Sequence, residues 1–153
     1  MMILIEDTRQ QSGKHENIHH YCERHGIEIV REKLSVGDYM LPGGNISVDS
    51  KSGLLELSRN LMNKSDHSRF YKECRRAREQ GLKLIILCEQ SGIRSIEDVK
   101  HWNSKYSPVS GRDLMERIYH TSISWGVEFI FCHRNATGKR LIELLTIDNS
   151  LHP

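Results

Sequence analysis

The chain has 153 residues, of which 37% are hydrophobic, 27% are charged and only three are proline. This length suits one domain, 1–153, and the composition excludes the disordered and fibrous classes. The net charge of +2 is too small to attract a polyanion, so nucleic-acid binding requires local clusters of positive charge. With no membrane span, no signal peptide and four widely spaced cysteines, we expect an intracellular, cytoplasmic protein with reduced thiols.

Hydrophobic periodicity and turn residues predict the secondary structure along the chain. A strand at 2–5 precedes a helix that begins at Ser12 and ends near His25, before Gly26. Three strands then form a β-meander, at 27–33, 38–41 and 46–51, with a turn at 42–45. The second half is predicted in this order: helix 54–61, helix 66–80, strand 83–88, short helix 95–102, loop 103–109, helix 110–126, strand 127–132 and helix 137–145.

The strand at 83–88 is apolar throughout and lies between predicted helices. This pattern is typical of a strand that is buried on both faces of its sheet. No repeat or long linker divides the alternating strands and helices. We therefore expect an α/β fold, a three-layer α/β/α sandwich around a mixed central sheet.

The predicted hairpin places three charged side chains on one face. If 42–45 is its loop, Asp38 lies directly opposite Asp49, and Lys51 lies two residues further along the same face. The other face would carry the apolar residues that turn toward the core: Tyr39, Leu41, Ile46 and Val48. A slip of one residue would move Asp38 to the opposite face.

Two opposed carboxylates repel each other unless something neutralises them. Hard oxygen ligands favour Mg²⁺ or Mn²⁺, and Mg²⁺ is often held by only one or two carboxylates. With a metal on Asp38 and Asp49, Lys51 could orient a water molecule or stabilise the charge that develops on phosphorus. This arrangement indicates phosphodiester hydrolysis. The alternative is a polar hairpin on which Lys51 forms only surface ion pairs.

An acidic residue, a turn and then an acid-x-Lys sequence resemble the signature of the PD-(D/E)XK nuclease superfamily. More specifically, the chain is similar to the XPF-type structure-specific endonuclease domain. The family pattern of Asp-x-Arg-Glu, Gly-Asp-Tyr and Glu-Arg-Lys corresponds to these residues: Asp7, Thr8, Arg9 and Gln10; Gly37, Asp38 and Tyr39; Asp49, Ser50 and Lys51. The order of later elements also matches, from Arg69, Phe70 and Tyr71 to the apolar run that ends in Glu89. Three residues depart from the pattern: Gln10, Asp49 and Ser50.

The resemblance implies a restriction-endonuclease-like fold and a Mg²⁺- or Mn²⁺-dependent endonuclease that cuts branched or structured DNA in repair or recombination. It adds Asp7 as a further acidic residue of the catalytic site that would assist in holding the metal, although Asp7 could equally be a turn residue at the entry to a helix. The chain looks like a compact, stand-alone, phage-like form, and it could pair with itself or with a partner subunit. Gln10 and Ser50 keep open the alternative of a catalytically silent DNA-binding or scaffold domain.

The predicted helix at 66–80 is basic on one side. Arg69, Lys72 and Arg76 share a face, and we expect these three and Arg9 to contact DNA. A basic helix face that is merely solvated is the alternative. Three isolated aromatic residues near helix ends are assigned no function, because such residues usually anchor the core: Trp102, Tyr106 and Trp125.

Overall fold

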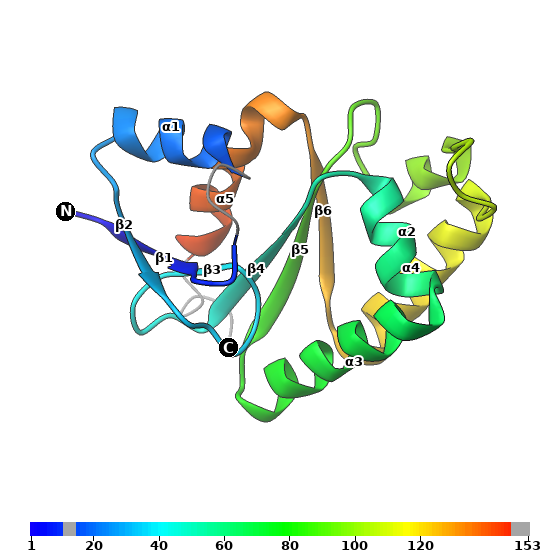
Figure 1. Cartoon of the computed structure of the whole chain (residues 1–153), viewed down its shortest axis with the longest axis horizontal. Helices are drawn as coiled ribbons and strands as arrows, with labels where there is room; N and C mark the ends of the chain where they lie inside the picture. The colour runs from blue at the N-terminus through cyan, green and yellow to red at the C-terminus, as the bar shows by residue number, and fades with distance from the viewer. Residues whose placement is uncertain (11–14, 148–153) are drawn as a thin grey trace.

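The structure is a computed structural model that describes residues 1–10 and 15–147, and Figure 1 shows a mixed sheet with helices on both faces. Within these residues six strands lie in the order β2-β1-β3-β4-β5-β6. The strands are β1 (Ile3–Asp7), β2 (Glu28–Glu32), β3 (Tyr39–Met40), β4 (Ile46–Lys51), β5 (Lys83–Glu89) and β6 (Glu128–Cys132). The helices are α1 (Glu16–Arg24), α2 (Leu54–Met62), α3 (Lys64–Glu79), α4 (Gly111–Trp125) and α5 (Thr137–Leu145), with short 3₁₀ helices η1 (Ile96–His101) and η2 (Arg134–Ala136).

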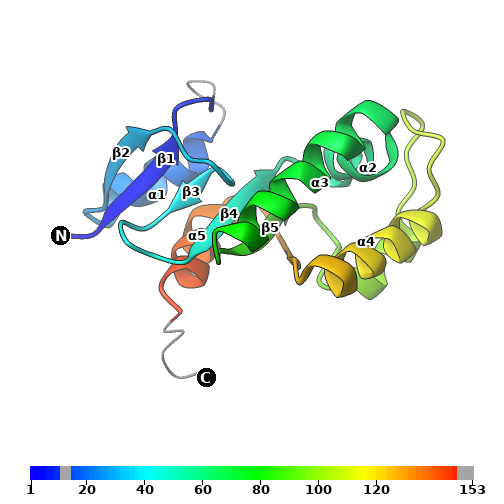
Figure 2. The same cartoon turned by 90° about the horizontal axis from the view of Figure 1, so that it is seen from below.

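The predicted α/β/α sandwich is confirmed. Helices α1 and α5 pack together on one face of the sheet, while α2, α3 and α4 cover the other (Figures 1 and 2). Strand β5 is buried on both faces, as predicted. Its residues Leu84 and Ile86 belong to the core beneath α2, α3 and α4, whereas Ile85 and Leu87 belong to the core beneath α1 and α5.

The predicted β-meander is wrong, because β2 does not lie beside β3. Strand β1 lies between them, parallel to β2 through the pair Ile5 and Val30, and antiparallel to β3 through Glu6 and Tyr39. The physical reason is the crossover helix α1, which returns the chain to the sheet parallel to β1. As a result, the end of β1 lies next to the start of β3.

The helix ends follow local signals in the sequence. As predicted, the Ser110 hydroxyl caps α4 by accepting a hydrogen bond from the backbone N–H of Asp113 (3.1 Å), and Gly126 ends the helix with a φ of +68°. Helix α1 is described from Glu16 onward, and the predicted start at Ser12 lies outside the described residues. Within residues 1–10 and 15–147, no helix has the length and apolar character to cross a membrane.

Gly37 makes a turn that brings Asp38 against β4. Its φ is +71°, which is costly for any residue with a side chain, and a Cβ atom there would overlap Ser47 Oγ and lie 3.1 Å from the carbonyl oxygen of Val48. The same Ser47 hydroxyl donates a hydrogen bond to the carbonyl oxygen of Val36 (2.6 Å). This close approach requires glycine.

Gly37→Ala should destabilise the protein more than Gly81→Ala. Gly81 has a similar φ of +68°, but a Cβ atom there would meet no other atom within 4 Å, so its substitution should cost only the backbone strain of about 1–2 kcal/mol. Overlap with Ser47 should add about 1–3 kcal/mol for Gly37→Ala. Urea unfolding of the two variants measures the difference, and equal losses would show that Gly37 is not tightly enclosed.

Candidate active site

The hairpin of β3 and β4 has the predicted register. Tyr39 pairs with Val48, and both side chains are buried in the core beneath α1 and α5. The backbone N–H of Asp38 donates to the carbonyl oxygen of Val48, and Asp38 Oδ2 accepts from the N–H of Ser50, both at 2.8 Å. These bonds fix the Asp38 carboxyl group beside β4.

Four ionisable side chains converge on the face of β4 that is covered by α3. Asp49 and Lys51 come from β4, Asp38 from the segment before β3, and Glu73 from α3. Lys51 Nζ lies 3.3 Å from Asp49 Oδ2, and only 13% and 9% of the two side chains are exposed. The predicted trio is therefore brought together, in a site that is largely buried.

The two opposed aspartates differ in their affinity for protons. Burial raises the pKa of Asp38 well above its usual value, and the charge of Asp49 raises it further. Burial also opposes ionisation of Asp49, but the charge of Lys51 and hydrogen bonds from Glu73 and Asp38 outweigh it and lower the Asp49 pKa. Asp49 is thus the ionised partner of Lys51, and Asp38 retains its proton more readily.

Glu73 is a further acid in the same cluster. Burial and the charge of Asp49 raise its pKa to about 8, and its Oε1 atom is buried with no hydrogen-bond partner among the described residues. Burial disfavours the charged form of Lys51, yet Asp49 and the acids around it outweigh that effect and raise the Lys51 pKa. The cluster therefore contains one ion pair, Asp49 with Lys51, and two carboxyl groups with raised pKa values, Asp38 and Glu73.

Asp7 anchors the segment that leads to Asp38. Its Oδ2 atom lies 2.7 Å from Arg9 Nε, and its Oδ1 atom accepts a hydrogen bond from the N–H of Leu34 (2.8 Å). Its backbone N–H donates to the carbonyl oxygen of Asp38 (2.8 Å). Asp7 lines the same cleft as the trio, but both of its carboxylate oxygens are engaged, and its role as a metal ligand stays a prediction.

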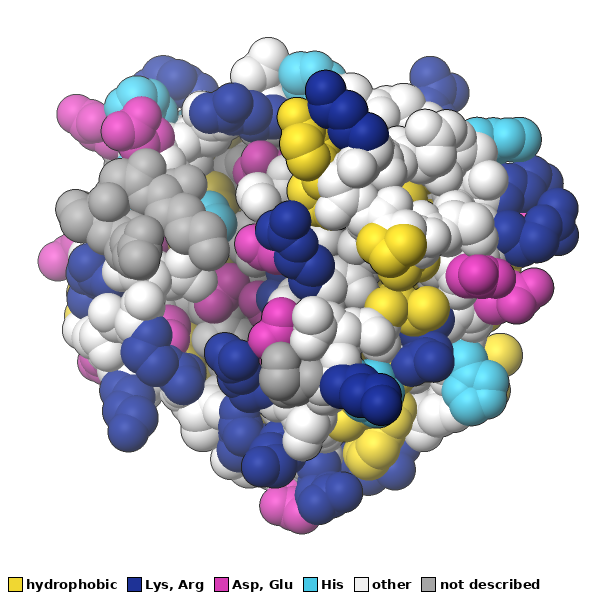
Figure 3. Space-filling view, turned by 45° about the vertical axis from the view of Figure 1, so that its right-hand side comes forward, with side chains coloured by type: hydrophobic (Ala, Val, Ile, Leu, Met, Phe, Trp, Pro, Cys, Tyr) yellow, Lys and Arg dark blue, Asp and Glu magenta, His cyan; other side chains and the backbone are white. Residues whose placement is uncertain are grey.

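A polar cleft opens beside the cluster. It consists of two adjoining pockets of about 350 and 420 Å³ that share four lining residues: Arg9, Asp49, Lys51 and Glu73. Arg69 and Arg76 from α3 line the first pocket as well. Figure 3 shows Lys and Arg side chains around acidic ones on one face of the molecule, in keeping with this mixture of charges.

Two of the three basic residues predicted on α3 face the cleft. Arg69 also pairs with Asp66 (3.0 Å), and Arg76 Nε donates to the carbonyl oxygen of Ser35 (2.9 Å). Lys72 is exposed and does not line the cleft. The face of α3 toward the cleft therefore runs through positions 69, 73 and 76, and Glu73 takes the place expected for Lys72.

Glu73 is a residue of the cluster that the sequence analysis does not predict. Its spacing from Arg69 and Arg76, four and three residues, was a usable signal, since residues three and four apart share a helix face. The sequence does not predict that α3 packs over β4, which is what brings Glu73 to Asp49.

Two of the three departures from the family pattern, Gln10 and Ser50, lie outside the group of four ionisable side chains. Gln10 lines the cleft, and its Oε1 atom lies 3.0 Å from His15 Nε2. Ser50 follows Asp49 on β4, so its side chain points to the other face of the sheet.

The residues that the structure describes include no group of three or more His, Cys, Asp or Glu side chains that could hold a metal ion.

Two solved structures from Aeropyrum pernix resemble this one. The structure of XPF has a TM-score of 0.68 at 17% identity, covering 97% of this chain and 67% of that one. The structure of XPF in complex with DNA has a TM-score of 0.71 at 16% identity, covering 99% of this chain and 66% of that one. These matches confirm the fold, and the chain spans about two thirds of the length of each match.

Sequence comparison gives a consistent result. No curated protein sequence matches the chain. The model of one family, described as the ERCC4 domain, matches residues 6–145. The match includes Lys51 and the three carboxyl groups of the acidic cluster, Asp38, Asp49 and Glu73. The resemblance to XPF-type nuclease domains is thereby confirmed, and the chain belongs to the ERCC4 domain family.

Proposed function

We propose that the chain is a divalent-metal-dependent endonuclease that hydrolyses phosphodiester bonds in branched or structured DNA. The observation that carries this proposal is the convergence of Asp38, Asp49, Glu73 and Lys51 in a cleft lined by arginines. Membership of the ERCC4 domain family supports a nuclease. The preference for branched DNA rests on the family resemblance.

The acidic cluster has the chemistry that Mg²⁺ or Mn²⁺ requires. Its donors are hard carboxylate oxygens, and a cation would satisfy the buried Oε1 atom of Glu73, which has no hydrogen-bond partner in the part of the chain that the structure describes. Asp38 and Asp49 would hold the metal, with Asp7 or Glu73 assisting, and water and substrate phosphate would complete an open site. When bound, the metal would lower the pKa of a water molecule and polarise the phosphoryl group.

The basic side chains of the cleft would have two roles, one at the reacting phosphate and one along the DNA strand. The Lys51 ammonium, held by Asp49, would orient the attacking water or stabilise the negative charge that develops on phosphorus. Arg9, Arg69 and Arg76 would contact the flanking phosphates and position the strand.

A catalytically silent DNA-binding or scaffold domain is the second candidate. It is favoured by the engagement of both Asp7 oxygens, which already bind Arg9 and the backbone of Leu34. A silent domain could still feed DNA to a partner subunit, and pairing with a partner or with a second copy stays a prediction.

Asp49→Ala should lower the rate of Mg²⁺-dependent cleavage by at least about 100-fold, while DNA binding is retained. Asp49 is both the proposed metal ligand and the partner that holds Lys51 in place. Initial rates on flap, fork and four-way-junction DNA with Mg²⁺ and Mn²⁺ measure the loss, and circular dichroism checks folding. Asp49→Asn keeps the shape of the side chain if the alanine variant unfolds.

The matched control for cleavage is Asp113→Asn, which changes an exposed aspartate in the first turn of α4, outside the cleft. It should cleave at the rate of the unmodified protein. Full activity of both Asp49 variants would contradict the site assignment.

Mn²⁺ titration separates the nuclease from the silent domain. The nuclease should bind Mn²⁺, and binding should be lost in the double variant Asp38→Asn, Asp49→Asn, because the carboxylate ligands are gone. Isothermal titration calorimetry makes the measurement. A protein that neither binds Mn²⁺ nor nicks any of the branched substrates would be the silent domain.

Metal-free protein should lose stability as the pH rises from 4.5 to about 8. Glu73 has a raised pKa, so its contribution is fully present below the unfolded value of 4.5 and is lost as pH rises through about 8. Glu73→Gln should weaken this pH dependence, measured by urea unfolding in EDTA. Glu79→Gln, an exposed change on the same helix, should leave it unchanged. Parallel curves for the Glu73 variant and the unmodified protein would refute the assignment.

A further inference from the structure

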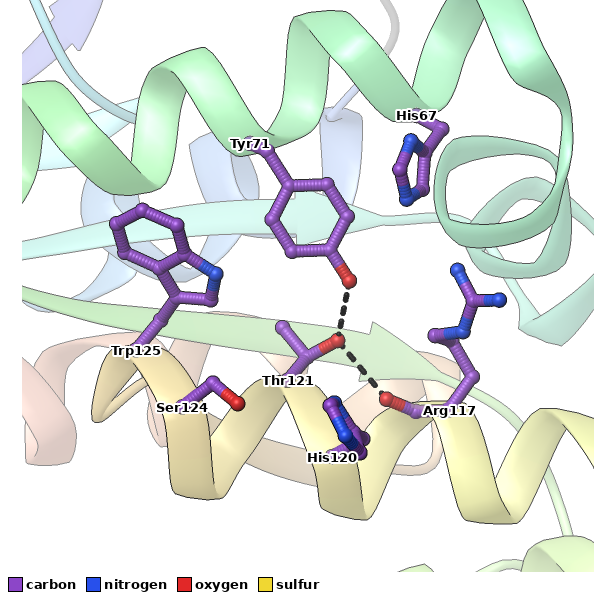
Figure 4. A pocket seen from close by; sticks show the side chains of 7 residues that line it. All are labelled: His67, Tyr71, Arg117, His120, Thr121, Ser124 and Trp125. Carbon is purple, nitrogen blue, oxygen red and sulfur yellow. Dashed lines mark hydrogen bonds between the residues drawn. The ribbon is translucent and has the colours of Figure 1, made fainter.

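A second pocket lies between α3 and α4, lined by residues other than those of the catalytic cleft. Its volume is about 440 Å³, within the range of roughly 300–1,000 Å³ that is usual for ligand pockets. Figure 4 shows side chains from both helices pointing into it, including Tyr71 and His67 from α3 and Trp125 from α4.

Two aromatic rings form one end of this pocket. The centroids of Tyr71 and Trp125 are 6.1 Å apart and the rings are tilted by 44°, so they do not stack on each other. Thr121 donates its hydroxyl hydrogen to the carbonyl oxygen of Arg117 (2.8 Å), so its oxygen accepts the Tyr71 hydroxyl (2.8 Å) (Figure 4). Arg78 lies 4.5 Å from the centroid of Trp125. The rings are therefore held in place before any ligand arrives.

Basic groups form the other end of the pocket. Arg117 lies there with His67 and His120, and none of the lining side chains is a carboxylate. Arg117 Nη1 donates to the carbonyl oxygen of Leu61 (3.1 Å), which uses one of the five N–H donors of a guanidinium. Aromatic rings beside fixed positive charge suit a nucleobase and its phosphate.

Helix α3 connects this pocket to the catalytic cleft. Successive residues of a helix are rotated by 100°, so positions 67 and 71 face the pocket while positions 69, 73 and 76 face the cleft. The exposed arc of α3 between these two faces carries Ser68, Lys72, Arg75 and Glu79. Lys72 and Arg75 therefore supply positive charge along the route from one site to the other.

We propose that the pocket between α3 and α4 binds a nucleotide of single-stranded DNA, with its base against Tyr71 and Trp125 and its phosphate near Arg117. The strand crosses α3 over Lys72 and Arg75 and reaches the catalytic cleft. The path of the strand from the pocket to the cleft rests on the proposed nuclease function. The pocket itself is tested without cleavage.

Ser124→Glu tests the pocket, because Ser124 is an exposed lining residue and the new carboxylate would repel a phosphate. The probe is a fluorescein-labelled thymidine oligonucleotide of about 12 nucleotides, in EDTA so that no cleavage occurs. Fluorescence anisotropy should show binding at least about tenfold weaker than for the unmodified protein. The control Ile123→Glu adds the same charge at a neighbouring exposed residue of α4 that does not line the pocket, and should bind normally.

A second measurement reports on stacking itself. In a Trp102→Phe background, Trp125 is the only tryptophan, and its fluorescence should be quenched as unlabelled oligonucleotide binds. No quenching, or oligonucleotide binding by Ser124→Glu within twofold of the control, would overturn the proposal. Equal displacement of the labelled oligonucleotide by a polyglutamate peptide would also overturn it, since that indicates binding of any polyanion.

Failure of this inference can be told from failure of the proposed function. A protein that cuts DNA but binds oligonucleotide without using the pocket refutes only the inference. A protein that never cuts DNA, yet loses oligonucleotide binding on Ser124→Glu, refutes only the nuclease and supports the pocket.

Discussion

The buried ion pair between Asp49 and Lys51 is the interaction on which the rest of the site depends. Removing two charges from water costs several kcal/mol for each ion, and only close contact and further hydrogen bonds offset that cost. Asp49 and Lys51 lie 3.3 Å apart, and burial together with the charge of Asp49 raises the pKa of both Asp38 and Glu73. Protons and a cation neutralise the same oxygens, so the proposed metal ion would take the place of the protons that Asp38 and Glu73 hold.

Sheet topology supplies the second constraint. Because β1 lies between β2 and β3, Asp7 reaches the segment before β3 and hydrogen-bonds the backbone of Asp38 and Leu34. Gly37 then allows that segment to approach β4 closely. Asp7 therefore acts on the cluster through the backbone of Asp38, and this role is independent of metal binding.

Local parts of this arrangement could be predicted from the sequence, and the non-local parts could not. The register that pairs Tyr39 with Val48 follows from a short loop and the two-residue period of a strand. The position of β1 between β2 and β3 depends on the crossover through α1. A hydrophobic pattern predicts the strands and the helix, but it does not give the order of strands in the sheet. Glu73 was missed for the same reason, because its function depends on α3 packing over β4. The spacing of Arg69, Lys72 and Arg76 places them on one side of the helix, but it does not show which side of α3 faces the cleft.

Helix α3 forms a wall of the polar cleft and of the pocket that contains Tyr71 and Trp125. A helix with its side chains is about 10–12 Å across, so a nucleic acid that visits both sites must bend sharply over it. Duplex DNA, with a persistence length of about 50 nm, resists such a bend, whereas an unpaired strand does not. A strand held on both sides of α3 would therefore have to be single, and its junction with duplex would lie outside this stretch. Binding at both sites would in this way give the proposed preference for branched DNA a physical cause in the geometry of α3.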